Sequence, residues 1–329
     1  MATGSSELGV AAQAATPQVA PNPPIKANGP PSTWPHRPLY DRVLRTLYAL
    51  PDKFETSLRI EGVPVTDLFT MNSALGAAIE KSVVDSLNDL RELWDPQHDY
   101  PDYRFVRQSQ CFPDVLLESI NPTPTHTPIL MGIELKGWFV LSKEGEPSFR
   151  YKIAPHCCAE ADLLVVMPWV FDSVISGKPK LLAPIITEAR WAASMRNHHW
   201  EWVRANRNGE PQERRRVTSA AHVGYYPTKS DRSSDTPVND SGNNFGRVAR
   251  CGAIDAEIDE RLKTDALGIP VEAWRRFLQV FVDGATPQAI LDGLTGIERA
   301  FVSPLASAQQ RQQASELLAQ LSGLLRNPS

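Results

Sequence analysis

Long apolar runs are missing from this chain of 329 residues. No segment approaches the roughly 18 apolar residues that a membrane-spanning helix requires. The N-terminus also lacks the basic start and the continuous apolar stretch of a secretory signal. Hydrophobic residues nevertheless make up 42% of the sequence, which is ample for a buried core. We therefore expect a soluble, intracellular globular protein with no membrane partner.

Cysteine is scarce, and its spacing excludes two common kinds of small domain. The four cysteines are Cys111, Cys157, Cys158 and Cys251, and they form neither a paired disulfide framework nor a C-x-x-C zinc motif. His156 precedes the Cys157-Cys158 pair, but three consecutive residues do not all reach one tetrahedral ion. We expect free thiols, most of them buried.

An excess of positive charge is also missing, since the formal net charge is −4. Binding to nucleic acid would therefore depend on a local patch rather than on the whole surface. One such patch runs from Arg190 to Arg250, where eleven Arg and Lys residues against six Asp and Glu residues give a local charge of +5. A solvated protein surface has the same composition, so both interpretations stay open at this point.

Three regions of the chain differ in composition. Ala, Pro, Gly, Ser and Gln dominate residues 1–34, and two Pro-Pro pairs there oppose helix and strand formation, which predicts a disordered tail. Residues 35–252 carry the periodic apolar patterns of a folded core, and residues 253–329 have a mostly helical pattern. This helical region either packs on the core or supplies a dimer interface.

The G-x-x-x-x-G-K-[ST] phosphate loop is absent, which argues against an ATP-driven motor.

Within the core region, apolar residues recur every three or four positions in 39–50, 72–90 and 184–204, which predicts three helices. A continuous apolar run at 163–167 predicts a strand that is covered on both faces. Three further segments have strand composition and short connections: 103–108, 112–120 and 128–141. We expect these three to form an antiparallel meander.

The sequence Glu134-Leu135-Lys136 is the sharpest chemical feature of the chain. On a strand, Glu134 and Lys136 point to the same face because side chains alternate, so a carboxylate and an ammonium group stand side by side. Lys136 is the only lysine in the chain with an acidic residue two positions before it. The pattern alone is weak, because a surface ion pair on an amphipathic strand has the same sequence.

Asp114 strengthens this pattern, because it follows Pro113 at the start of the preceding predicted strand. The turn between the two strands brings Asp114 toward Glu134, and two such carboxylates repel each other unless a cation lies between them. Oxygen ligands of this kind suit Mg²⁺, which takes one or two carboxylates together with water and substrate phosphates. Asp102 also follows a proline and competes with Asp114, but the segment after Pro101-Asp102 lacks an apolar run, so we favour Asp114.

Together these residues resemble the PD-(D/E)XK nuclease family, and within it the type II restriction endonucleases. The resemblance covers about residues 72–205 and is carried by Pro113-Asp114, nineteen intervening residues and Glu134-Leu135-Lys136. Many members also have an acid on the helix before the meander, and Glu80 has that position. The resemblance implies an α/β fold with a restriction-endonuclease-like core, in which helices flank a central mixed β-sheet. The helical C-terminal region that the sequence pattern predicts would follow this core.

The resemblance also implies a reaction. Asp114 and Glu134 would bind Mg²⁺, Lys136 would orient a water molecule and offset negative charge, and Glu80 would support a second ion or the water network. The products would carry 5′-phosphate and 3′-hydroxyl ends. The implied partners are double-stranded DNA, a second copy of the chain in a homodimer that matches a palindromic target, and a cognate DNA methyltransferase, all in the cytoplasm of a prokaryote.

The basic segment at about 190–250 is the predicted DNA-recognition region, because Arg, Lys and Asn side chains bind phosphates and base edges. The candidate DNA-binding residues are Arg214, Arg215, Arg216, Lys229, Arg232, Asn243, Asn244, Arg247 and Arg250. Two alternatives stay open. The same core also occurs in structure-specific and repair nucleases, and a chain with this core can serve as a DNA-binding protein without catalysis.

Overall fold

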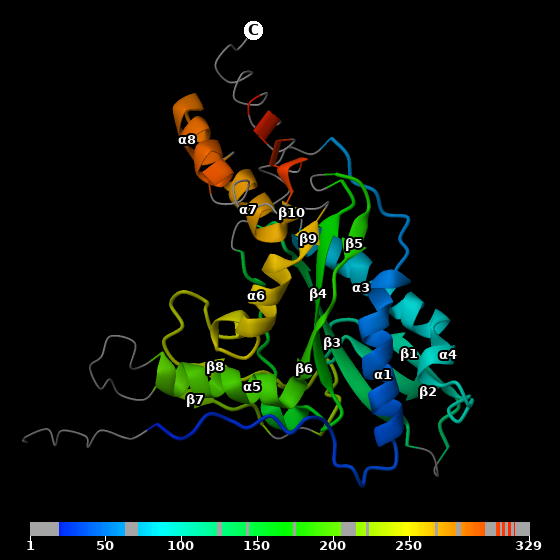
Figure 1. The fold of residues 1–329 in the computed structure, drawn as a ribbon. Coiled ribbons are helices and arrows are strands. Elements are labelled where there is room, and N and C mark those ends of the chain that lie inside the picture. Colours follow the sequence, from blue (N-terminus) through cyan, green and yellow to red (C-terminus); the bar gives the residue numbers. More distant parts are fainter. Residues whose placement is uncertain are drawn as a thin grey trace, which may run out of the picture.

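A computed structural model gives the fold of this protein. It describes residues 20–62, 72–123, 127–142, 145–173, 176–204, 215–221, 224–266, 269–280 and 284–299, together with a few residues between 307 and 319. One sheet runs through the middle of the molecule in Figure 1, with α1, α3 and α4 on the right and α5 and α6 on the left.

The central sheet is mixed, as predicted. It has the strand order β1-β2-β3-β4-β5, and β6 also pairs with β4. All neighbouring strands are antiparallel except β3 and β4, which run parallel. The strands are β1 (Tyr103–Arg107), β2 (Val115–Ser119), β3 (Ile129–Phe139), β4 (Leu163–Phe171), β5 (Pro179–Leu181) and β6 (Ile185–Glu188). The antiparallel meander predicted for the first three strands is therefore confirmed.

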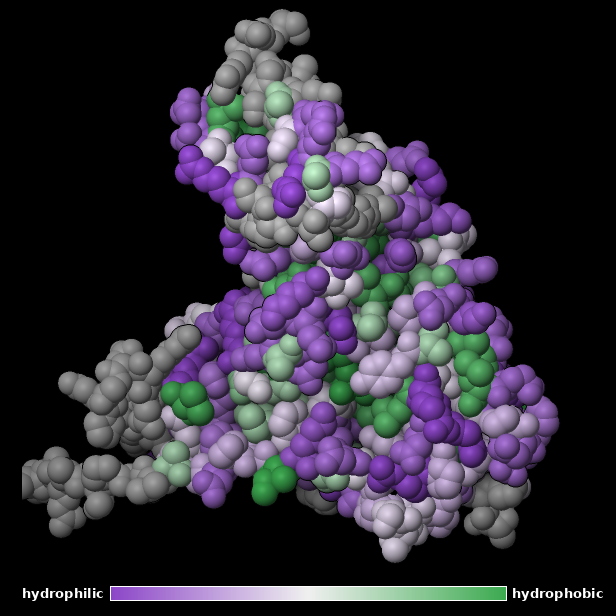
Figure 2. Space-filling model, in the orientation of Figure 1, coloured by the Kyte–Doolittle hydropathy of each residue, from purple (hydrophilic) through white to green (hydrophobic). Residues whose placement is uncertain are grey.

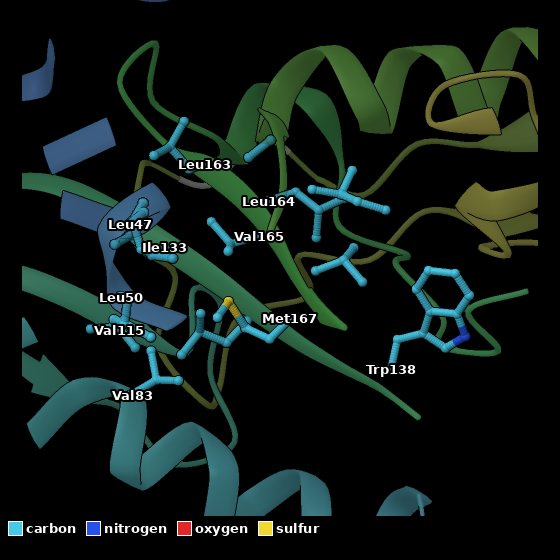
Figure 3. Packing of buried hydrophobic residues seen from close by; sticks show 14 of the residues in the cluster. Leu47, Leu50, Val83, Val115, Ile133, Trp138, Leu163, Leu164, Val165 and Met167 are labelled. Carbon is cyan, nitrogen blue, oxygen red and sulfur yellow. The ribbon is translucent and has the colours of Figure 1, made fainter. Parts of the chain in front are cut away.

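Strand β4 forms the centre of the core, and all of its nine residues are buried. This confirms the prediction of a strand that is covered on both faces. Figure 3 shows Leu163, Val165 and Met167 of this strand close to Leu47 from the first helix and Val83 from α3. Each such side chain stabilises the fold by about 1.5–3 kcal/mol relative to exposure to water.

Two of the predicted helices cover the sheet with their apolar stripes. Helix α1 spans Arg37–Ala49 and buries Leu39, Val43 and Leu47. Helix α3 spans Asn72–Asp89 and buries a stripe of four residues at helical spacing: Leu75, Ile79, Val83 and Leu87. The spacing of the apolar residues therefore located both helices in the sequence.

The third predicted helix, at 184–204, is wrong in its first part. Residues Ile185–Glu188 form strand β6, and α5 begins only at Ala189 and ends at His198. A π-helical turn, His199–Val203, follows. The β-branched residues of β6 pair with an open edge of β4, and this tertiary pairing overrides the local helical pattern.

The expectation of a disordered tail fails for residues 20–34. The carboxylate of Glu188 accepts hydrogen bonds from the backbone N–H groups of Ala27 and Gly29, at 3.1 and 2.7 Å. The indole of Trp191 donates to the carbonyl oxygen of Pro24, and Lys26 lies over the same ring. This arm therefore lies along α5, because side chains of the core satisfy its backbone groups. Residues 1–19 lie outside the described part of the chain.

The C-terminal region is mostly helical where it is described. Ile254, Ile258, Val271 and Leu278 belong to the main hydrophobic core, so part of this region packs on the rest of the fold, which is one of the two arrangements expected for it. Its elements are α6 (Asp255–Lys263), the short strands β9 (Asp265–Ala266) and β10 (Ile269–Pro270), α7 (Val271–Val280) and α8 (Pro287–Ile297).

Short elements complete the fold: η1 (Leu50–Asp52), α4 (Arg91–Trp94), η2 (Pro155–Cys157), β7 (Val217–Thr218), β8 (Thr236–Pro237) and η4 (Val248–Arg250). The prediction for the cysteines is confirmed, since all four are free and only Cys111 is partly exposed.

Hydrophilic residues cover most of the described surface on the face drawn in Figure 2, and hydrophobic residues stand there in small groups. Among the helices in the described part of the chain, none combines the length and the apolar character that crossing a membrane takes.

Candidate active site

The candidate site lies where β2 and β3 separate. The register pairs Val115 with Ile133, and continuing it by one residue places Asp114 opposite Glu134. Beyond Ile133, β3 pairs only with β4, so the N–H of Leu135 has no partner on β2. Asp114 fills this place, because its Oδ2 accepts a hydrogen bond from Leu135 N at 2.9 Å. The start of β2 therefore fixes the position of the Asp114 carboxylate.

Lys136 lies between the two carboxylates. Its Nζ is 2.7 Å from Glu134 Oε1 and 3.2 Å from Asp114 Oδ2. The side chains of Lys136 and Glu134 are 17% and 12% exposed, and that of Asp114 is 23% exposed. The alternation of side chains along β3 places Glu134 and Lys136 together, and the pairing with β2 brings in Asp114. The structure therefore gathers the three residues that the sequence pattern selected.

Burial shapes the protonation of this group. Burial raises the pKa of Glu134 to about 7. The attraction of Lys136 lowers this pKa, and the repulsion of Asp114 raises it. Burial by itself lowers the pKa of Lys136, but the attraction of Glu134 and Asp114 outweighs this effect and raises the pKa above its ordinary value. Lys136 therefore stays protonated at neutral pH, while Glu134 loses its proton only as the pH approaches neutral.

Glu80 comes to the same place from α3. Burial, and then the repulsion of Asp114, raise the pKa of Glu80, while Lys136 and Arg107 act in the opposite direction. Arg107 Nη2 of β1 lies 3.3 Å from Glu80 Oε2. Both Asp114 and Lys136 act on the pKa of Glu80, so this carboxylate lies next to the site.

Two contacts hold α3 close enough for Glu80 to reach. A Cβ atom on Gly137 of β3 would meet the Cα of Gly76 at 3.6 Å, an ordinary van der Waals distance, so helix and strand approach through two glycines. At the end of the helix, the amide of Asn88 donates to Phe105 O and accepts from Phe105 N, at 2.8 and 2.9 Å. Glu80 lies one turn after Gly76 and is therefore directed toward this part of the sheet.

The donor set at this site fits a magnesium ion. Asp114 and Glu134 supply hard carboxylate oxygens, and Asp114 Oδ1 accepts no hydrogen bond from the residues that the structure describes. No group of three or more His, Cys, Asp and Glu side chains in the described ranges lies close enough to hold an ion alone. An ion here would therefore depend on these two carboxylates together with water and substrate phosphate, which is a common arrangement for Mg²⁺.

The competing aspartate lies elsewhere. Asp102 precedes β1, and its side chain accepts a hydrogen bond from Asn121 Nδ2 at 2.9 Å, while its carbonyl accepts from Ile120 N. Because β1 and β2 are antiparallel, Asp102 lies at the end of the pair opposite to Asp114. The choice of Asp114 over Asp102 therefore agrees with the geometry of the sheet.

A cavity of about 350 Å³ opens beside Glu134. Residues from three segments line it: Gln110, Cys111, Phe112, Arg150, Tyr151, Lys152, Ile153, Thr228, Lys229, Asp231, Ser233 and Ser234. Lys229 is one of the predicted DNA-binding residues, and exposed Arg232 lies between lining residues of the same segment. Residues 228–234 of the basic segment thus border the cavity beside Glu134.

The other candidate DNA-binding residues differ in their surroundings. Arg250 pairs with Glu146 and donates to Asn244 Oδ1 at 3.1 Å. Arg215 lies over the ring of Trp200, with 5.2 Å to its centroid. Arg216 is exposed beside the short β7–β8 hairpin, and Asn243 is exposed as well, whereas Arg247 is half-buried. Arg214 lies outside the described residues.

The local charge of +5 overstates the free positive surface. Arg196 is 2% exposed and pairs with buried Asp235 at 2.8 Å. Arg190 donates two hydrogen bonds to the carbonyl oxygen of Cys158 and lies over the ring of Tyr225. Both arginines hold the fold together, so a count of charges along the sequence mixes structural cations with available ones.

Two cations of the cavity, Arg150 and Lys152, were not predicted from the sequence, because they lie outside the basic segment 190–250. Their spacing of two residues in an extended segment was the available signal, since it directs both side chains to one side. Asp162 was not predicted either, and it is fully buried and accepts hydrogen bonds from Gly132 N, Ala159 N and the hydroxyl of Tyr226. Burial raises the pKa of Asp162 to about 6 despite these bonds.

Comparison of the chain with protein families, with curated proteins and with solved structures finds no match.

Proposed function

We propose that this protein is a magnesium-dependent DNA endonuclease with a restriction-endonuclease-like core. The observation that carries the proposal is the meeting of Asp114, Glu134 and Lys136 where β2 and β3 separate, with Lys136 Nζ 3.2 and 2.7 Å from the two carboxylates. Three elements, α3, β2 and β3, direct acidic side chains to this one place. A surface ion pair would not need such convergence.

The order of the elements supports the same proposal. A helix, α3, precedes three antiparallel strands, and β4 then joins β3 in parallel. This topology agrees with the fold that the PD-(D/E)XK resemblance implies. It also explains the cluster, because β2 and β3 separate beside α3, which carries Glu80.

The chemistry follows from the side chains. Asp114 and Glu134 would hold Mg²⁺, which when bound would withdraw electron density from the scissile phosphate. Lys136 would donate a hydrogen bond to the attacking water and offset the negative charge that develops on the phosphate oxygens. The water oxygen forms a bond to phosphorus and gives up a proton to the surrounding water, while the bond to the 3′ oxygen breaks and this oxygen takes up a proton from water, so the products carry 5′-phosphate and 3′-hydroxyl ends. Glu80 would accept a hydrogen bond from the water network beside Asp114.

The finer parts of the proposal come from the sequence resemblance. They are sequence-specific cleavage of double-stranded DNA as a type II restriction enzyme, a homodimer on a palindromic site, and a cognate methyltransferase in a prokaryotic cytoplasm. One chain offers one such site, so a double-strand break is most simply made by two copies. The free cations beside the cavity would contribute contacts to DNA phosphates.

The test compares wild type, Lys136→Ala and a matched control, Lys180→Ala, on unmethylated phage DNA with Mg²⁺ and with EDTA. Lys180 is exposed on β5, so its replacement removes the same charge away from the site. We expect discrete fragments from wild type and control with Mg²⁺ only, and a loss of about 10²–10³-fold in rate for Lys136→Ala.

Other results would contradict the proposal in distinct ways. Equal cleavage by Lys136→Ala would mean that the active site lies elsewhere. Cutting at junctions or ends, without defined fragments, would indicate a structure-specific nuclease. Binding of DNA without any cleavage would indicate a DNA-binding protein on the same core.

A further inference from the structure

Three cations line the cavity beside Glu134. Arg150 and Lys229 are exposed and Lys152 is half-buried, and all three line the cavity. None of them forms a salt bridge or a side-chain hydrogen bond with the residues that the structure describes. Three like charges around one cavity repel each other, so an anionic ligand there would stabilise the protein.

The carboxylates of the same cavity are already engaged. Glu134 pairs with Lys136 at 2.7 Å. Asp231 accepts hydrogen bonds from the N–H and the hydroxyl of Thr228, at 2.8 and 2.7 Å, and these bonds lower its pKa. The donors of Thr228 are neutral, so the Asp231 carboxylate keeps its charge and offsets one of the three cations, and the cavity retains an excess of positive charge from Arg150, Lys152 and Lys229.

The segment that carries Lys229 is anchored to the core. Tyr226 donates its hydroxyl hydrogen to buried Asp162, which also accepts from Gly132 N of β3. Pro227 is buried next to Tyr226, and Ala154 N donates to Ser233 O. These contacts on both sides of Lys229 hold the segment against the core, so the fold sets the position of Lys229 beside the cavity.

We propose that this cavity binds the sugar-phosphate backbone of one DNA strand next to the scissile phosphate, with Arg150, Lys152 and Lys229 as the phosphate contacts. The inference rests on the proposed function for the identity of the polymer. A volume of about 350 Å³ suits a nucleotide-sized group, so one strand enters rather than a whole duplex. The cations come from two chain segments that both border Glu134, and a polyanion with regularly spaced charges matches that arrangement better than a single small anion.

Cys111 supplies a readout that does not depend on catalysis. It lines the cavity and is partly exposed, whereas the other three cysteines are buried. In EDTA, where no cleavage takes place, a bulky thiol reagent should modify Cys111 of wild type, and a short DNA duplex should slow this reaction. Cys111→Ser identifies the thiol, because it should abolish the fast reaction.

The test removes the three charges together, as Arg150→Gln, Lys152→Gln and Lys229→Gln. We expect DNA affinity at low salt to fall at least tenfold, the slope of log affinity against log salt to decrease by about 0.9 per lost contact, and the protection of Cys111 to disappear. The matched control replaces three exposed cations away from the cavity, as Arg45→Gln, Lys178→Gln and Lys180→Gln, and should bind as wild type does. Thermal unfolding of both variants checks that they fold.

Two outcomes would overturn the inference. One is a cavity variant that binds DNA with unchanged affinity and salt dependence, and the other is a wild type whose Cys111 reacts equally fast with and without bound DNA. These outcomes are separable from a failure of the proposed function. Protection that depends on the three cations, in a protein that cleaves nothing with Mg²⁺, would sustain this inference and refute the nuclease. Cleavage with unchanged binding by the cavity variant would do the reverse.

Discussion

The Nζ of Lys136 lies 2.7 Å from Oε1 of Glu134, and both side chains are mostly buried. The pair stands on one strand, so its geometry comes from the alternation of side chains alone. Its electrostatic state comes from the tertiary structure, because burial and the carboxylate of Asp114 both raise the pKa of Glu134. The position of this pair is therefore a local property of the chain, while its protonation depends on the fold.

Stability of the metal-free protein should fall as the pH rises from about 4.5 to about 7, because of Glu134. The pKa of this carboxyl is raised to about 7 in the folded state, so over this range the unfolded chain releases a proton that the folded protein retains. Relative to Glu134→Gln, wild type should lose at most about 3 kcal/mol of unfolding free energy across the range.

Urea denaturation in EDTA at several pH values measures this change in the unfolding free energy. Glu55→Gln, at an exposed carboxylate, is the matched control. A constant difference between wild type and Glu134→Gln would refute the prediction.

Magnesium affinity should increase with pH up to about 7 and then level off. A carboxylate must lose its proton to bind the ion, and the proton on Glu134 competes with Mg²⁺ below its pKa of about 7. Calorimetric titration of wild type with Mg²⁺ should show about a tenfold gain in affinity per pH unit below this value. Asp114→Asn should bind more weakly at every pH. An affinity that does not change with pH would show that Glu134 is not a ligand.

Replacing one residue of the Arg196–Asp235 pair should strongly lower the free energy of unfolding. The two side chains are 2% and 0% exposed, and Arg196 also donates to the carbonyl oxygens of Tyr151 and Ile153. Arg196→Met would leave a buried carboxylate without its cation, at a cost of about 3–5 kcal/mol. Urea denaturation of Arg196→Met, Asp235→Asn and the double variant measures the coupling. We expect the double variant to be less destabilised than the sum of the two single variants, and strict additivity would contradict the role of the pair.

The N-terminal arm should open when Glu188 is replaced. Its carboxylate, in a residue that is 8% exposed, accepts the N–H groups of Ala27 and Gly29. In Glu188→Ala these bonds are lost, so trypsin should cleave after Lys26 about ten times faster or more, with the core still intact. Glu160→Ala, at an exposed carboxylate, should cleave as slowly as wild type. An unchanged rate in Glu188→Ala would show that other contacts hold the arm.

Much of the candidate site follows from local patterns in the sequence. The spacing of Glu134 and Lys136 determines their common side of a strand, whatever the rest of the fold does. The apolar stripe of α3 determines which side of that helix packs inward, and thereby the position of Glu80 at the edge of the stripe. The continuous apolar run at 163–167 likewise required a strand that is buried on both faces, as β4 is.

Other features depend on contacts between residues far apart in the chain, which one sequence does not display. Strand β6 forms because β4 has an edge to pair with, although its residues continue a helical pattern. The arm at 20–34 is ordered because Glu188 and Trp191 satisfy its backbone groups, although its own composition is that of a disordered segment. The division of the cations into structural ones, such as Arg196, and available ones, such as Arg150, also arises only in the folded chain.

The sequence by itself therefore determined the residues of the candidate site, because strand and helix periods are local properties of the chain. Only the tertiary structure decided their surroundings: the separation of β2 and β3 that leaves room for Asp114 to bind Leu135 N, the burial that raises the pKa of Glu134, and the approach of Lys229 to the cavity. The physical reason is that burial and electrostatic interactions depend on distances in space, which the packing of the whole chain sets.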